Sequence, residues 1–173
     1  MNYTFLPTQL TDSDDDWIES FRRTWYPRLH PHLSSLGDSI GIPLYAVGPV
    51  HKNQYVGITK IGEESFEREL EKIGFVRNPI ACLKSLDDDR LSEGSWVLLS
   101  ENDPSGKIED GMQLHITFFE REDGETGREV YAHYEDDWRE NATAHLREKN
   151  FSAEEGVQIA RGILDEHSFM VIE

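Results

Sequence analysis

Hydrophobic and polar positions alternate along two neighbouring stretches in the second half of the chain, 112–121 and 127–135. Their apolar positions are Leu114, Ile116, Phe118, Val130, Ala132 and Tyr134. A period of two, with many β-branched and aromatic residues, predicts β-strands. The segment between them contains Asp123 and Gly124, and glycine adopts positive φ without a steric penalty. We therefore predict a β-hairpin whose turn is centred on Gly124.

This turn fixes which residues lie opposite each other in the hairpin. Residues equally distant from Gly124 become partners, so that Phe118 faces Val130 and the apolar positions share one face. The other face carries Gln113, His115, Thr117, Phe119, Tyr131, His133 and Glu135. His115 then lies directly opposite His133. A slip of one residue would exchange the two faces, so this arrangement depends on the turn.

The remaining pattern predicts a single α+β domain over 1–173, with 1–12 as an extended N-terminal arm. Helical spacing of apolar residues predicts helices near 14–26, 63–73 and 152–166, and a shorter one near 31–36. Ser152 and Glu155 form a capping box at the start of the last long helix. Further strands are predicted at 43–50, 54–60, 95–100 and 168–173. The segments 95–100, 112–121 and 127–135 should form an antiparallel meander within a sheet of about five or six strands, covered on one face by helices.

Composition narrows the partners that we expect. Hydrophobic residues make up 37% of the chain, which is enough for a packed core, and the formal net charge is −17. So much negative charge argues against binding to nucleic-acid backbones or anionic membranes. The single cysteine, Cys82, is expected to be a small buried hydrophobe. The N-terminus lacks the pattern of a signal peptide, and no stretch is long enough for a membrane helix, so we expect a cytoplasmic protein or part of a virion assembled in the cytoplasm.

The charged residues also have an unusual distribution. The 34 acidic residues are spread along the chain, and six lysines accompany eleven arginines. With the stretches LHITFF, VYAHYEDDW and GFVRNPIACLK, the chain resembles small acidic proteins of unassigned activity from haloarchaea and their viruses. This resemblance implies a structural or adaptor protein of a halophilic archaeal or viral system that works by assembly, through self-association or a protein partner. Trp17 and Trp25 on one helical stripe are candidate binding residues, as are Thr117 and Tyr131 on the hairpin.

The histidine pair on the hairpin allows two interpretations. Directly opposed residues have Cβ atoms about 4.5–5.5 Å apart, so His115 and His133 could share a metal ion or a phosphate. The simpler interpretation is a solvated sheet face with ordinary polar side chains. A zinc site would require a third ligand, for which Glu135, Glu129 and Asp136 are all candidates.

Two other histidines, His145 and His167, lie near predicted helices and are interpreted as surface or capping residues. The chain contains no G-x-S-x-G elbow, no H-E-x-x-H sequence and no glycine-rich phosphate-binding loop. Complete motifs for these chemistries are therefore missing.

One tripeptide, His115-Ile116-Thr117, resembles the H-x-T element of two-histidine phosphoesterases. The resemblance implies phosphoester hydrolysis with His115 and His133 as acid and base. Those enzymes have a second such element, whereas here Glu135 stands where its hydroxyl residue would be. We therefore predict a non-enzymatic structural, adaptor or interaction protein without a cofactor. The alternative is a metal-dependent or two-histidine hydrolase, with zinc at His115, His133 and Glu135.

Overall fold

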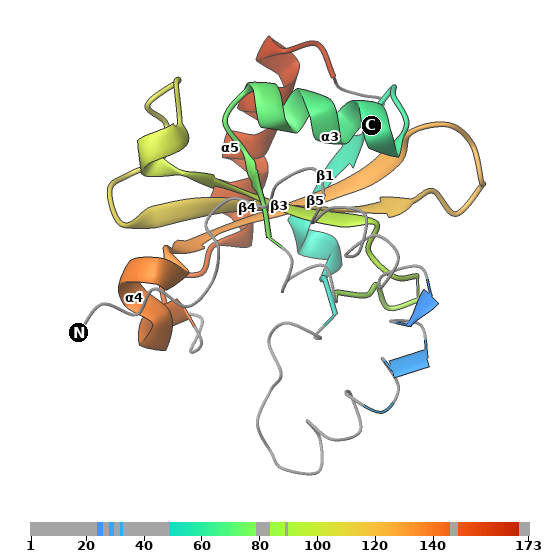
Figure 1. Ribbon diagram of the computed structural model, residues 1–173, viewed down its shortest axis with the longest axis horizontal. Coiled ribbons are helices and arrows are strands. Elements are labelled where there is room, and N and C mark those ends of the chain that lie inside the picture. Colours follow the sequence, from blue (N-terminus) through green and yellow to red (C-terminus); the bar gives the residue numbers. More distant parts are fainter. Residues whose placement is uncertain are drawn as a thin grey trace.

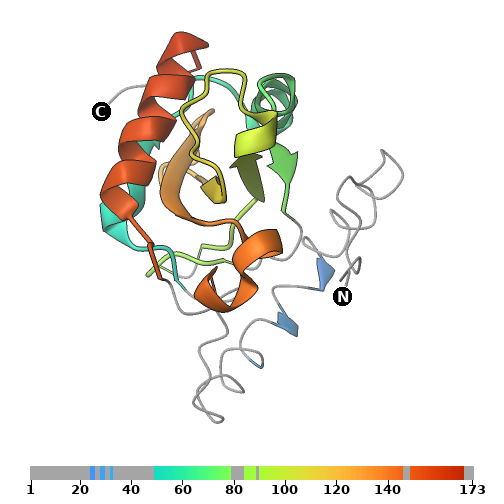
Figure 2. The same cartoon turned by 90° about the vertical axis from the view of Figure 1, so that its left-hand side faces the viewer.

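The computed structural model describes residues 24–25, 28–29, 32, 49–78, 84–88, 90–145 and 149–169. Its elements in chain order are the short 3₁₀ helix η2 (Lys52–Gln54), β1 (Tyr55–Ile58), α3 (Glu63–Lys72), β2 (Val76–Arg77), β3 (Gly94–Leu99), the 3₁₀ helix η4 (Ser100–Asn102), β4 (Met112–Glu120), β5 (Arg128–Asp136), α4 (Trp138–His145) and α5 (Ala153–Glu166). Figures 1 and 2 show one sheet with helices packed against it. The predicted single α+β domain with an antiparallel sheet is confirmed.

The sheet has five strands in the order β1-β5-β4-β3-β2, and every pair is antiparallel. Strands β3, β4 and β5 form the predicted meander. Both edges are short, because β1 has four residues and β2 has two. The register of β1 shifts between Tyr55 and Gly57, and Arg161 Nε of α5 donates a hydrogen bond to Val56 O at 2.9 Å.

The predicted hairpin register is confirmed at every pair that the sequence specified. Phe118 pairs with Val130, and His115 pairs with His133. Gly124 lies in the turn with φ +69°, as the turn prediction required. Because the side-chain period is two, this register fixes which residues share each face.

The apolar face of the hairpin forms the main core beneath α3 and α5, which lie on the same side of the sheet in Figure 1. Ile116 and Phe118 are fully buried. The ring of Phe66 on α3 meets Phe118 edge to face, with ring centres 5.3 Å apart. The two helices begin within one residue of the predicted positions. Ser152 Oγ accepts a hydrogen bond from Glu155 N at 3.2 Å, which confirms the N-cap of α5.

The opposite face is also buried, so the interpretation of a solvated face is wrong. His115 is 1% exposed, His133 is 4% exposed and Glu135 is 1% exposed. Helix α4 lies on this side of the sheet, away from α3 and α5 (Figure 1). A smaller apolar cluster covers the end of this face near the hairpin turn and consists of Val50, Leu86, Phe119 and Tyr131, with Tyr55 packed against it.

Several predictions lie outside the described residues. They concern the arm 1–12, most of the helix 14–26 with Trp17, the helix 31–36, the strand over 43–48, Cys82 and the end of the chain after 169. Trp25 is described and is 54% exposed. In the part of the chain that is described, no helix has the length and hydrophobicity needed to span a membrane.

Candidate metal centre

Three side chains from β4 and β5 converge on the face of the sheet that is opposite α3 and α5. His115 and His133 are direct cross-strand partners, and their rings meet edge to face with centres 4.7 Å apart. Glu135 lies two residues beyond His133 on the same face of β5. The ring of Phe151 packs against the ring of His133, with ring centres 4.9 Å apart, and covers His133.

The facing atoms of these residues form a nearly equilateral triangle. His115 Nδ1 is 3.1 Å from His133 Nε2, His133 Nε2 is 3.1 Å from Glu135 Oε1, and His115 Nδ1 is 3.6 Å from the same oxygen. A tetrahedral zinc ion with bonds of about 2.0–2.2 Å holds its ligand atoms roughly 3.3 Å apart. The observed triangle matches that spacing, and the three residues fit a metal ion as a group.

Partners outside the triangle orient both imidazoles toward its centre. His133 Nδ1 is 2.9 Å from Gln54 Oε1, an atom that only accepts hydrogen bonds, so Nδ1 carries the proton. In the tautomer with its hydrogen on Nδ1, His133 directs the lone pair of Nε2 into the triangle. His115 Nε2 is 2.5 Å from Ser95 Oγ. In the tautomer that donates a hydrogen bond from Nε2 to this hydroxyl, Nδ1 of His115 also directs a lone pair into the triangle. Such contacts from the outer ring nitrogen are typical of metal-binding histidines.

Both oxygens of Glu135 are held by neighbouring side chains. Gln113 Nε2 donates to Oε1 at 3.0 Å, and His145 Nδ1 lies 3.4 Å from Oε2. Gln113 is fully buried, and its own Oε1 accepts no hydrogen bond from the described residues. A buried acceptor without a donor costs about 1–3 kcal/mol. A water molecule bound next to the triangle would supply that donor.

The electrostatics of the centre favour a neutral His115 beside an ionised Glu135. Burial lowers the pKa of His115 to about 4, assisted by His133 and the nearby Lys84 and opposed by Glu135. Burial alone would raise the pKa of Glu135, but its interactions with His133 and His115 lower it well below its usual range. Deprotonated nitrogen and oxygen donors are the forms that bind metal ions.

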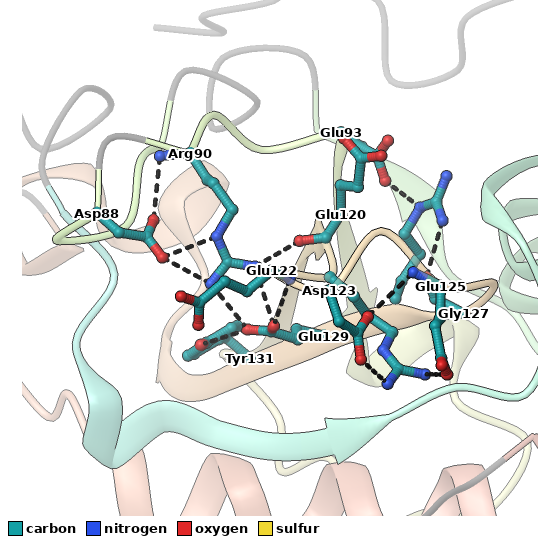
Figure 3. A network of polar contacts seen from close by, with 12 residues as sticks. Asp88, Arg90, Glu93, Glu120, Glu122, Asp123, Glu125, Gly127, Glu129 and Tyr131 are labelled. Atoms are coloured by element: carbon teal, nitrogen blue, oxygen red, sulfur yellow. Dashed lines mark hydrogen bonds and ion pairs between the residues drawn. The ribbon is translucent and has the colours of Figure 1, made fainter.

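The structure also decides between the three carboxylates that the sequence left open. Glu129 lies toward the hairpin turn, where Arg90 binds both of its oxygens at 2.9 and 3.2 Å and Tyr131 donates to it at 3.2 Å (Figure 3). Asp136 accepts from Asn150 Nδ2 at 3.2 Å on each oxygen. Only Glu135 among the three belongs to the triangle.

Two predicted binding residues lie away from the triangle. Tyr131 belongs to the Arg90–Glu129 network, and burial next to Glu129 raises its pKa. Thr117 is 2% exposed on the same sheet face, one pair closer to the turn. Neither contacts His115, His133 or Glu135 in a recorded interaction.

Three residues that orient the centre were missed by sequence reasoning. Gln54 is 79 positions from its partner His133, and nothing in the sequence connects the two. Ser95 is placed beside His115 by the pairing of β3 with β4, which the predicted meander contained in outline. His145 was interpreted as a surface or capping residue, but it is partly buried against Glu135. His167 does end α5 as an exposed C-cap residue.

The donor set of two histidines and one carboxylate suits a divalent transition metal, and the triangle matches the ligand spacing of zinc. Calcium and magnesium prefer sites made of oxygen ligands, which this centre does not offer. Comparisons with protein-family models, with curated proteins and with solved structures found no match.

Proposed function

We propose that this chain is a non-enzymatic metal-binding protein that holds one zinc-like ion between β4 and β5. His115 Nδ1, His133 Nε2 and Glu135 Oε1 would be the protein ligands. The observation that carries the proposal is the triangle of 3.1, 3.1 and 3.6 Å, formed by lone-pair-bearing atoms that outside partners aim at one another. A bound ion would replace the repulsion between these atoms with attraction and would join two strands of the meander.

Burial supports a structural role for the ion over a catalytic one. The three ligand residues are between 1% and 4% exposed, so little of their surface is accessible to a substrate. An ion that binds only the folded chain stabilises it in proportion to the logarithm of its concentration over Kd. The expected consequence is a protein whose unfolding temperature rises with zinc.

The first test is metal analysis of the protein purified in molar salt without a histidine tag. We expect about one equivalent of zinc per chain, or uptake of one equivalent when zinc is added to metal-free protein. Glu135→Gln keeps the volume of the side chain but removes the charge, and it should abolish tight binding. His167→Ala is the matched control, because it removes a histidine from the exposed end of α5 and should change nothing. A wild-type protein that takes up neither zinc nor cobalt would refute the proposal.

A metal-dependent hydrolase is the second candidate, favoured by the number of ligands. Three protein ligands leave a fourth position, where catalytic zinc sites hold a water molecule. The unpaired acceptor of Gln113 is suited to such a water. Zinc-loaded protein should then cleave an activated phosphodiester such as bis(p-nitrophenyl) phosphate, and Glu135→Gln should not. If both proteins cleave the phosphodiester only at the background rate, the result would support the non-enzymatic role.

The partner of the protein stays a prediction. We propose self-association or binding to another protein, and two exposed apolar side chains support this: Trp25 is 54% exposed and Leu29 is 38% exposed. Light scattering at high salt would measure the mass. A monomer that Trp25→Ala leaves unchanged would argue against self-association through this segment.

A further inference from the structure

Helix α4 brings one more side chain to the metal centre, although its sequence gave no such indication. His145 is the last residue of α4, and its Nδ1 lies 3.4 Å from Glu135 Oε2 and 3.2 Å from Asp136 O. Asp136 O only accepts hydrogen bonds, so Nδ1 carries the hydrogen that it donates to this oxygen. The same nitrogen lies beside Glu135 Oε2, the carboxylate oxygen that is not part of the triangle.

Glu135 is thus held at both ends. Gln113 Nε2 donates to Oε1 at 3.0 Å, and His145 Nδ1 lies 3.4 Å from Oε2. Oε1 is the oxygen that contacts the two imidazoles, at 3.1 Å from His133 Nε2 and 3.6 Å from His115 Nδ1. Oε2 is the oxygen that contacts His145.

We propose that His145 is a positioning residue that makes Glu135 bind the metal through one oxygen. This inference rests on the proposed metal-binding function. Binding through one oxygen keeps the coordination number at four when a water completes the site, and four ligands are what zinc and cobalt(II) accept in tetrahedral geometry. A carboxylate released to bind through both oxygens would raise the coordination number and suit larger ions better. His145 therefore sets which ions the centre prefers.

The local backbone of α4 supports a positioning role for this residue. Asn141 has non-helical torsion angles, φ −128° and ψ 46°, which interrupt the helix one turn before His145. Asp137 holds the start of α4 through hydrogen bonds to Arg139, and Arg139 reaches Glu101 at 2.8 Å. The interruption changes the direction of the last turn, so His145 reaches the sheet while the start of α4 stays anchored beyond β5.

The test uses cobalt(II) in place of zinc, because its visible absorption reports the coordination number. Wild-type protein should give the intense bands of a four-coordinate ion. His145→Ala should give weaker bands of a higher-coordinate ion and a zinc affinity lower by about 10- to 100-fold, the usual effect of losing a partner of a metal ligand. His145→Asn places an amide N–H where Nδ1 was and should restore the wild-type spectrum.

The outcomes separate this inference from the function on which it rests. Wild-type protein without any cobalt uptake would refute the metal centre itself. Wild-type-like spectra and affinity in His145→Ala would overturn the role of His145 and leave the centre standing. A purely structural role for His145 would lower the thermal stability of metal-free protein without changing the bound spectrum. His167→Ala is the matched control, because it removes a histidine from the exposed end of α5, and it should keep the wild-type cobalt spectrum and zinc affinity.

Discussion

The two faces of the β4–β5 hairpin come from the same eighteen positions of chain and are equally buried, yet they are built differently. On one face, side chains such as Ile116 and Phe118 pack against α3 and α5 and need only the right volume. On the other, His115, His133 and Glu135 each require specific polar partners, because a buried polar group without one is costly. Burial of the apolar face stabilises the fold, whereas the hydrogen bonds of the polar face orient its side chains.

The largest expected effects come from one mutation on each face, which should change stability and zinc affinity separately. Phe118→Ala removes a fully buried ring that meets Phe66, and it should cost about 3–5 kcal/mol of unfolding free energy. The affinity of the folded protein for zinc should remain near the wild-type value. Glu135→Gln should have the reverse profile, with binding lost. Denaturant unfolding and zinc titration of both variants measure this, and equal loss of zinc affinity in the two would break the distinction.

Between pH 7 and 4, acid should act first on the polar face, where His115 titrates. The pKa of His115 falls from an ordinary value near 6.5 to about 4 in the folded protein, so the unfolded chain binds more protons in this range. Stability of metal-free protein should therefore fall as the pH drops below about 6.5, by up to about 3 kcal/mol near pH 4. Glu135, whose pKa is also lowered, adds to the loss as pH falls further. Unfolding of wild type and His115→Gln between pH 7 and 4 checks this, and parallel curves would contradict it.

One glycine of α5 packs against the backbone of β5, so a methyl group there should disturb both faces of the hairpin. A Cβ added at Gly156 of α5 would lie 2.3 Å from His133 Cα and 2.6 Å from Tyr134 N, both backbone atoms that cannot turn aside. Gly156→Ala should cost about 1–3 kcal/mol by overpacking and should also weaken zinc binding, because it displaces β5 at a ligand. Gly162→Ala, whose Cβ would meet only Lys107 Nζ at 3.6 Å, is the control and should be neutral or stabilising. Equal behaviour of the two variants would argue against the close contact.

The smallest effect concerns charges outside both faces. Lys107 and Glu166 form an ion pair at 2.6 Å, with side chains 32% and 59% exposed. Lys107→Ala should cost no more than about 1 kcal/mol at low salt and nothing at 1 M, where screening acts over about 3 Å. Zinc affinity should change little over the same salt range, since its ligands are buried. The same titration tests the predicted halophilic setting, because a net charge of −17 should make wild-type stability rise with salt.

Features of the fold and of the site could be predicted where the residues that form them are close together along the chain. The turn at Gly124 and the period of two were sufficient for the register, and with it for the meeting of His115, His133 and Glu135. These are local relations within one hairpin. The burial of that face was not predictable, because its cover comes from distant segments with no matching pattern, such as Gln54 and Phe151. The choice of Glu135 over Glu129 required the position of Arg90, which arrives from a separate loop.

The short edges of the sheet have a consequence for how this protein can meet another copy of itself. Amyloid-like growth and strand exchange begin when a long, flat edge strand offers free N–H and C=O groups to an incoming chain. Here β1 is four residues long and irregular at Gly57, and Arg161 already occupies the carbonyl of Val56. At the opposite edge, β2 has only two residues. Along these two strands the fold offers little template for cross-β polymerisation, and a crowded, salt-rich solution would favour contacts between side chains over extension of the sheet.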